Sequence, residues 1–410
     1  MSLPLRTTLY FVVAGLNSFG TTLFFYYFYF FARHEFGFDN RQNLWLAALQ
    51  GGLYAVGSWV GGRCAQRWGY GQALRVGLVA MGTCLAGGTL MEEARQHVAV
   101  LAVVTLGMCF TWPALEALVT EGEDRAGIQR SVGLYNLVWA GAGALAYFLG
   151  GAILDRCGMA ALHWVPLGIV GLELAVAEVA GRLGSPRART MSPADPPSEG
   201  PQPSVAEQRL FLKMAWLANP FAYMAIQTLV AVMPGIASRL ALSTTWAGIC
   251  GSVWCFARLG AFALLWRWAG WHYRFGWLLG AFTALVASFA AVVLVPNLAV
   301  VVTAQLLFGL ALGLIYYSSL FYSMDAGEAK GEHGGIHEAA IGLGNMSGPL
   351  IGALALQLWP ARLESGAVAV SLLLVGGWLA LLRLRLRQTR GAGVGLGSPA
   401  HAERRAARTR

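Results

Sequence analysis

The segment from 331 to 340, GEHGGIHEAA, gathers titratable residues and glycines in a chain that is otherwise strongly apolar. His333 and His337 are four residues apart, which would place both imidazoles on one face of a helix, and Glu338 follows directly. Two histidines and a carboxylate could bind a metal ion and activate a water molecule. The two glycines between the histidines favour a turn, which would remove that helical spacing. The segment therefore predicts either a metal site or a turn that leads into a helix.

The composition shows what kind of elements must position these residues. Of the 410 residues, 57% are hydrophobic and 12% are charged, which is more apolar than a soluble domain. Apolar segments that approach or reach the roughly 20 residues needed to cross a bilayer recur along the chain. They lie at about 8–32, 43–64, 72–91, 97–119, 130–154, 160–181, 211–234, 243–266, 275–295, 298–322, 336–359 and 365–384. The sequence thus predicts an all-α integral membrane protein with twelve transmembrane helices.

Basic residues are distributed unevenly between the two sides of these predicted helices. If the chain starts in the cytoplasm, most of the 29 Lys and Arg residues fall in loops and ends on that side. We therefore expect both termini in the cytoplasm. The first apolar stretch is too long and too aromatic for a cleaved signal peptide, and only 2 of the 29 basic residues are lysine, which with the many Ala and Gly residues favours a bacterial inner-membrane protein. Contact with anionic lipid headgroups accounts for the net charge of +9 without a nucleic acid partner. The six cysteines show no paired spacing, so we expect no disulfide framework and no zinc motif.

The chain also reads as two halves. Residues 183–207 form the only long stretch between predicted helices that is rich in Pro, Ser and charge, which indicates a linker. Shifting the first half by 202 positions matches Asn17 with Asn219 and Gly150 with Gly352, which favours a duplicated six-helix unit. The predicted parts are a first bundle at 1–182, the linker, a second bundle at 208–386 and a basic cytoplasmic tail at 387–410.

This organisation resembles the major facilitator superfamily of secondary transporters over essentially the whole chain. The short loop after the second helix has Gly62, Arg67 and Gly69 where the family pattern has its glycines and arginine, although Gln66 and Tyr70 depart from that pattern. A second family pattern is matched on the eleventh helix by Gly335, Gly344, Gly348, Pro349 and Gly352. The resemblance implies two six-helix bundles that rock about a central site, with the short loop latching them on the cytoplasmic side.

Polar residues on helices 1, 5, 7, 8, 10 and 11 are the candidates for contact with a solute. The resemblance places these helices around the cavity, and polar groups within a membrane are rare unless they are used. Hydrogen bonding between helices remains the alternative for each of them. The candidates are Asn17, Thr21, Asn136, Trp139, Asn219, Tyr223, Gln227, Trp254, Tyr316, Tyr317 and Asn345.

Charged residues within or beside the predicted helices are candidates for ion coupling or for a gate. Glu116 lies inside an apolar run and could relay protons, bind a cation or pair with a nearby arginine. Arg258 could bind a substrate anion or pair with an acid such as Glu116. Together with two glycines of the short loop, the candidates for coupling or the gate are Glu116, Arg67, Gly62, Gly69, Arg258, His337 and Glu338.

Two further interpretations concern Glu338 and the tyrosines of the first helix. In family members the start of helix 11 meets the short loop, so Arg67 would have Glu338 within reach. Glu173 has no assigned role. Tyr26, Tyr27 and Tyr29 are expected mainly in an aromatic belt at the membrane interface, with Tyr26 as the one that could face inward.

The sequence therefore predicts a transporter that moves a small organic solute by alternating access. Proton coupling is one option, and a monomer in contact with lipids, with no cofactor, is expected. A neutral or weakly charged solute is favoured, and Arg258 leaves room for an organic anion. The alternatives are a drug or metabolite efflux antiporter and a non-transporting membrane sensor or scaffold. An intramembrane metalloenzyme is disfavoured, because a turn at the glycines would separate His333 from His337.

Overall fold

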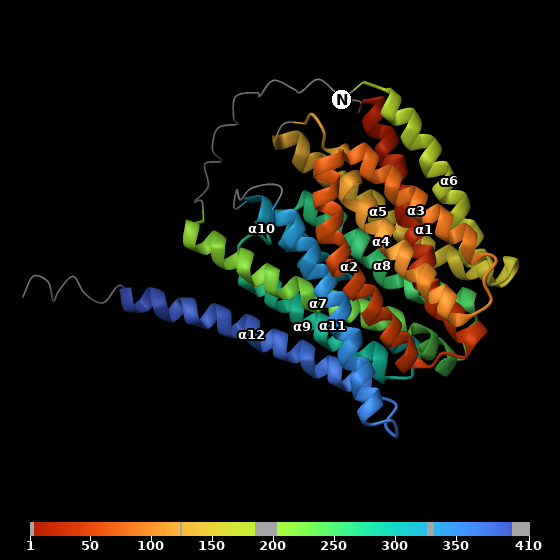
Figure 1. Ribbon diagram of the computed structural model, residues 1–410. Coiled ribbons are helices and arrows are strands. Elements are labelled where there is room, and N and C mark those ends of the chain that lie inside the picture. Colours follow the sequence, from red (N-terminus) through yellow and green to blue (C-terminus); the bar gives the residue numbers. More distant parts are fainter. Residues whose placement is uncertain (1–3, 124, 185–202, 326–331, 396–410) are drawn as a thin grey trace, which may run out of the picture.

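The computed structural model describes residues 4–123, 125–184, 203–325 and 332–395, and these residues form twelve α-helices and no strand (Figure 1). The first six helices are α1 (Leu5–Phe36), α2 (Asn40–Trp68), α3 (Tyr70–Gly88), α4 (Ala94–Val119), α5 (Arg125–Cys157) and α6 (Ala161–Arg182). The second six are α7 (Val205–Arg239), α8 (Thr244–Arg267), α9 (Phe275–Leu294), α10 (Leu298–Asp325), α11 (Glu332–Leu358) and α12 (Ser365–Gly395).

The two sets of six form two bundles with matching helix contacts. In the first bundle α1 packs against α4, α5 and α6, and in the second α7 packs against α10, α11 and α12. The pairs α2–α4, α3–α4 and α3–α6 likewise recur as α8–α10, α9–α10 and α9–α12. Adding six to each helix number thus converts one packing pattern into the other, as expected for a duplicated unit. Figure 1 shows the first bundle in red to yellow and the second in green to blue.

Short connections with specific local signals reverse the chain between consecutive helices. Gly37 ends α1 in a left-handed conformation (φ 68°), which glycine adopts without steric cost. Asp39 then accepts a hydrogen bond from the Gln42 amide, while the Gln42 side chain accepts one from the Asp39 amide. This reciprocal cap starts α2. Because the helices alternate in direction, all odd-numbered helices begin at one face, here named the terminal face.

The outer surface of the bundles is suited to lipid. Among the described residues, ten helices are long and apolar enough to cross a membrane, all except α2 and α3. Large apolar side chains such as Val56, Trp59 and Leu372 are exposed on the outside. Trp45, Trp164 and Trp359, near helix ends, are exposed as well. An apolar surface of this kind matches the hydrocarbon environment predicted from the composition.

Most helices extend a few residues beyond the predicted segments, and three helix ends lie in parts predicted as linker, tail or turn. The helix α7 begins at Val205, inside the predicted linker, and α12 continues to Gly395, inside the predicted tail. The helix α11 begins at Glu332, so Gly334 and Gly335 belong to the helix and the predicted turn there is wrong. Hydropathy detects only the lipid-facing part of a helix, and these polar extensions carry no such signal.

The two bundles meet where α2 packs on α11 and where α5 packs on α8. Glycines allow backbones to approach closely at the first contact. A Cβ atom added at Gly51 would lie 2.3 Å from the backbone nitrogen of Met346, and one added at Gly342 would lie 2.4 Å from the Cα atom of Ala55. The α2–α11 crossing thus depends on the absence of side chains at these positions.

Candidate functional site

A cavity of about 260 Å³ lies between the two bundles. It is lined by side chains from α1, α2, α4 and α5 of the first bundle and from α7, α8, α10 and α11 of the second. It extends toward the terminal face, since Glu116 lies near the end of α4 and Glu338 near the start of α11. The helices that line it include the six, 1, 5, 7, 8, 10 and 11, that carry the predicted solute contacts.

Most of the predicted solute contacts lie at this cavity. Trp139 of the first bundle contacts the second bundle at the cavity. Its ring lies against those of Phe262 (centroids 5.8 Å apart) and Tyr316 (5.7 Å). Its indole N–H donates to Asn136 Oδ1 at 2.8 Å, and the Nδ2 atom of Asn136 has no partner among the described residues. The predicted residues that line the cavity are Thr21, Asn136, Trp139, Tyr223, Gln227, Trp254, Tyr316 and Asn345.

Asn17, Asn219 and Tyr317 do not line the cavity, in contrast to what the sequence predicted. Asn17 is fully buried inside the first bundle, where its Nδ2 donates to Glu173 Oε2 at 3.0 Å and its Oδ1 accepts from the Thr111 hydroxyl at 3.2 Å. Tyr317 packs inside the second bundle, and Asn219 is buried in α7. Glu173, for which the sequence suggested no role, thus joins α6 to α1.

We expect the Asn17→Ala variant to be less stable but unchanged at the solute site. The substitution leaves the buried Glu173 carboxyl and Thr111 hydroxyl without this partner, at a cost of about 1–3 kcal/mol. The melting temperature in detergent should fall, whereas the solute affinity of the folded fraction should stay the same. Thr83→Ala is the control, because Thr83 is exposed and bonds only to its own helix. A selective loss of solute affinity in Asn17→Ala would contradict this placement.

Arg258 on α8 is a buried charge at the cavity wall. Its guanidinium lies 4.7 Å from the ring centroid of Trp139 and 4.8 Å from that of Trp254, and the residue is 9% exposed. Its Nε atom has no hydrogen-bond partner, and no carboxylate of the described residues forms an ion pair with it. The two tryptophans supply cation–π contacts, but none of the described carboxylates neutralises the charge.

Two carboxylates from different bundles also line the cavity. The Glu116 side chain is exposed at the cavity, and Glu338 Oε2 accepts a hydrogen bond from the Tyr54 hydroxyl at 2.5 Å. Neither forms an ion pair with a basic residue of the described chain.

The predicted gate pair is not formed. Arg67 is exposed at the end of α2, beside the exposed Gly69, and Glu338 bonds Tyr54 instead. A Cβ atom added at Gly62 or Gly69 would meet nothing within 4 Å. His337 belongs to α11, but its side chain lies outside the described residues, as does that of His333.

Sequence reasoning missed a hydrogen-bonded triad that joins the two bundles beside the cavity, on the side away from the terminal face. Gln227 of the second bundle donates to Gln50 Oε1 (2.8 Å) and to the Tyr29 hydroxyl (3.0 Å), and Tyr29 donates to Gln50 (2.7 Å). The interface belt predicted for the tyrosines is therefore wrong: Tyr26, Tyr27 and Tyr29 are all buried, and Tyr26 lines the cavity. Gln50 and Tyr54 are four positions apart on α2, and this spacing could have indicated a polar face of that helix toward the cavity.

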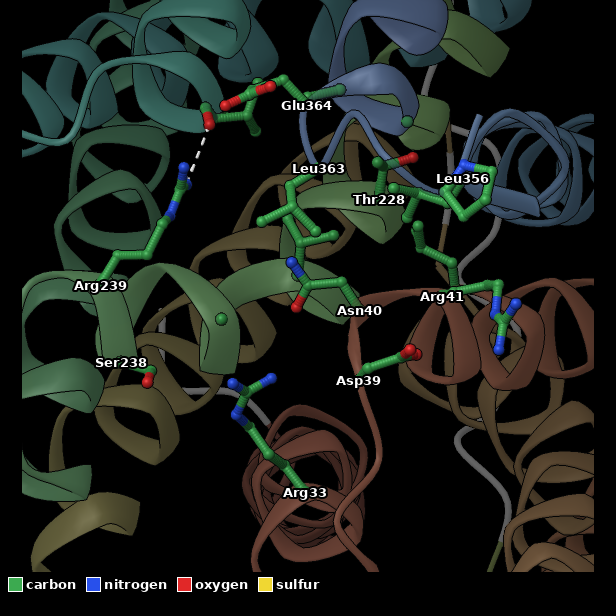
Figure 2. A pocket seen from close by; sticks show the side chains of 17 residues that line it. Arg33, Asp39, Asn40, Arg41, Thr228, Ser238, Arg239, Leu356, Leu363 and Glu364 are labelled. Atoms are coloured by element: carbon green, nitrogen blue, oxygen red, sulfur yellow. Dashed lines mark hydrogen bonds between the residues drawn. The ribbon is translucent and has the colours of Figure 1, made fainter. Parts of the chain in front are cut away.

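A second pocket of about 460 Å³ lies beyond the Tyr29–Gln50–Gln227 triad, on the face opposite the terminal face. Figure 2 shows Arg33 and Asp39 from the α1–α2 corner and Arg239 from the end of α7 around it. Arg239 donates to the Val293 carbonyl at 3.0 Å. At the same level, Asp155 at the end of α5 accepts from the Thr245 hydroxyl (2.6 Å) and amide (2.9 Å) at the start of α8. The two bundles are thus held together by polar contacts on this face.

Comparison with known proteins connects this architecture to transport. Residues 10–336 match the family model described as Major Facilitator Superfamily. No curated protein matches the sequence. Among solved structures, the chain is similar in fold to a bacterial homolog of the human lysosomal transporter Spinster in an inward-facing, unoccupied conformation. That comparison has a TM-score of 0.67 and 14% identity, and it covers 94% of this chain and 96% of that one.

Two further solved structures share the fold. A structure of a proton dependent oligopeptide transporter has a TM-score of 0.69 and 14% identity, with 93% of this chain and 99% of that one covered. The nucleoside transporter NupG has a TM-score of 0.68 and 10% identity over the same shares. The fold, the cavity between the bundles and the family match agree, and this chain belongs to the major facilitator superfamily, whose members share the fold of secondary transporters.

Proposed function

We propose that this protein is a secondary active transporter that moves a small organic solute across the bacterial cytoplasmic membrane by alternating access. The observation that carries the proposal is a cavity between two pseudo-symmetric bundles, extending toward the terminal face, with the Tyr29–Gln50–Gln227 triad joining the bundles on its opposite side. Rocking of the bundles would break this triad and expose the same cavity to the other side.

The proposed orientation follows from the charge distribution. Basic residues are concentrated at the chain ends and in the loops of the terminal face, and such loops stay in the cytoplasm. The terminal face is then cytoplasmic, and the described conformation faces inward. The pocket around Arg33 and Arg239 is then the external vestibule.

Glu116 and Glu338 support proton coupling. Carboxylates inside a membrane protein are costly and are retained where ions or protons move. These two come from different bundles and line one cavity without a fixed cation partner among the described residues. Each could bind a proton on one side and release it on the other.

Crosslinking across the opposite face tests alternating access. Asp155→Cys and Thr245→Cys, introduced together in a protein whose native cysteines are replaced by serine, can be joined by a short bifunctional thiol reagent. The reagent fixes α5 to α8 on the closed face, so solute exchange in proteoliposomes is expected to stop. A reagent with a reducible bond should restore exchange after reduction.

The control is a crosslink within one bundle. Arg75 and Glu178 lie 2.8 Å apart (Nη2 to Oε2) on α3 and α6, and both belong to the first bundle. Cysteines at these positions, crosslinked in the same way, should leave exchange intact because the bundle moves as a unit. Continued exchange with α5 fixed to α8 would refute the proposal.

A further inference from the structure

We infer that the transported solute is an organic anion with an aromatic or apolar body, and that Arg258 is the residue that binds its anionic group. The inference rests on the proposed transport function and narrows its substrate class. It starts from a charged side chain at the cavity wall, the Arg258 guanidinium, which forms no ion pair with a carboxylate of the described residues.

Burial makes an unpaired charge at this position costly. A charge held away from water is costly unless it is paired and hydrogen-bonded, and removing a partner from such a charge is strongly destabilising. Arg258 is 9% exposed, makes no hydrogen bond to the described residues through Nε, and is supported only by the faces of Trp139 and Trp254. A carboxylate from the cavity would supply both the charge and the paired hydrogen bonds that a guanidinium fork accommodates.

The nearest acids of the cavity cannot take this role in the described conformation. Glu116 lies three residues before the end of α4 at Val119, and Arg258 lies nine residues before the end of α8 at Arg267. Both helices end at the terminal face, so the difference of six residues places Arg258 about 9 Å deeper, at 1.5 Å per residue. Glu338 is bonded to Tyr54. The position beside Arg258 is therefore left to a solute.

The surrounding walls indicate what the anion carries. Tyr147, Tyr223, Trp112 and Tyr316 line the same cavity as Trp139 and Trp254, so a ring or apolar chain would be enclosed by aromatic surface. Asn136 Nδ2 and Asn345 Oδ1 have no partner among the described residues and could bind one further polar group.

The two carboxylates then link the anion to a proton. Glu116 and Glu338 line the part of the cavity between Arg258 and the terminal face. In their charged forms they repel an anion that enters or leaves there, and protonation removes this repulsion. Anion and proton would therefore move together.

Matched ligands of three charges test the inference. The probes are benzoate, 3-phenylpropionate and indole-3-acetate, each compared with the corresponding amide and amine, and binding is measured by the rise in melting temperature of the purified protein. We expect at least one acid to bind at least about 10-fold more tightly than its amide, since charge-assisted hydrogen bonds are stronger than neutral ones. The amines should not bind measurably.

Variants of Arg258 assign the preference to this residue. Arg258→Gln should reduce the acid-to-amide affinity ratio to about 1, and Arg258→Lys should retain part of it, because lysine keeps the charge but not the planar fork. Arg267→Gln, at the exposed end of the same helix, should leave the ratio unchanged. If Arg258→Gln does not fold, a lower acid-to-amide affinity ratio in Arg258→Lys than in native protein still assigns the preference to Arg258.

The outcomes separate this inference from the proposed function. Equal binding of acids and amides, preferential binding of amines, an unchanged ratio in Arg258→Gln, or no binding of any probe would overturn the anion site. Transport is then measured separately, as the entry of a binding probe into proteoliposomes compared with its entry into protein-free liposomes. Arg258-dependent binding without exchange would overturn transport and leave the anion site standing.

Discussion

Proteoliposomes that contain the Glu116→Gln variant are expected to lose solute accumulation driven by a pH gradient while they retain solute exchange without a gradient. A gradient of one pH unit stores about 1.4 kcal/mol per proton, enough for about 10-fold accumulation at one proton per solute. Glutamine cannot carry a proton, so accumulation should fall to equilibrium. Exchange should persist, because it requires only that the loaded transporter reorient.

Glu338→Gln, tested in parallel, shows which carboxylate carries the proton. Glu178→Gln is the matched control, because Glu178 is an acid that pairs with Arg75 and Arg182 outside the cavity. It should retain full accumulation. Full pH-driven accumulation in the double variant Glu116→Gln/Glu338→Gln would refute proton coupling through the cavity carboxylates. A solute flux that ignores the pH gradient in native protein would refute it as well.

The Gly51→Ala variant is expected to be both less stable and slower in transport. The added Cβ atom would lie 2.3 Å from the Met346 nitrogen and 2.4 Å from the Asn345 carbonyl carbon, both of which are backbone atoms of α11. One helix must therefore shift, and overpacking of this kind costs about 1–3 kcal/mol. The shift occurs where the bundles meet, so we expect a lower melting temperature and a reduced exchange rate.

The neighbouring glycine provides the control for this variant. A Cβ atom added at Gly52 would lie 3.4 Å from the Sδ atom of Met346, the end of a flexible side chain. Gly52→Ala has the same change of composition on the same helix, so it should alter the melting temperature and the exchange rate much less. Equal effects of the two substitutions would show that the close crossing of α2 and α11 is unimportant.

Hydropathy predicted the helices well because lipid imposes a simple rule on most of them, all except α2 and α3. The segment predicted at 275–295 corresponds to α9 (Phe275–Leu294), which is apolar throughout. The prediction of α7 was less accurate, because its first turns, from Val205, contain Glu207 and Arg209 and extend beyond the apolar part. A hydropathy scale based on transfer to lipid cannot distinguish a polar helix end from a loop.

The candidate site was predicted less completely, because a single sequence does not determine how each helix is rotated about its axis and thus which side chains face the cavity. Asn17 and Thr21 are four residues apart and share a face of α1, yet Thr21 lines the cavity and Asn17 bonds Glu173. The helix α1 contacts α4, α5, α6 and α7 at once, so adjacent turns of one face meet different neighbours. Arg258 was identified as a charged candidate, but its position between two tryptophans depends on three-dimensional packing.

The triad of Tyr29, Gln50 and Gln227 also has a thermal consequence. When such a closure opens, water can replace each hydrogen bond, so the net free energy of separation is small. An apolar plug would instead expose hydrocarbon to water and raise the heat capacity on opening. Opening of this polar closure should contribute little heat capacity, so the enthalpy of opening should be nearly the same at different temperatures.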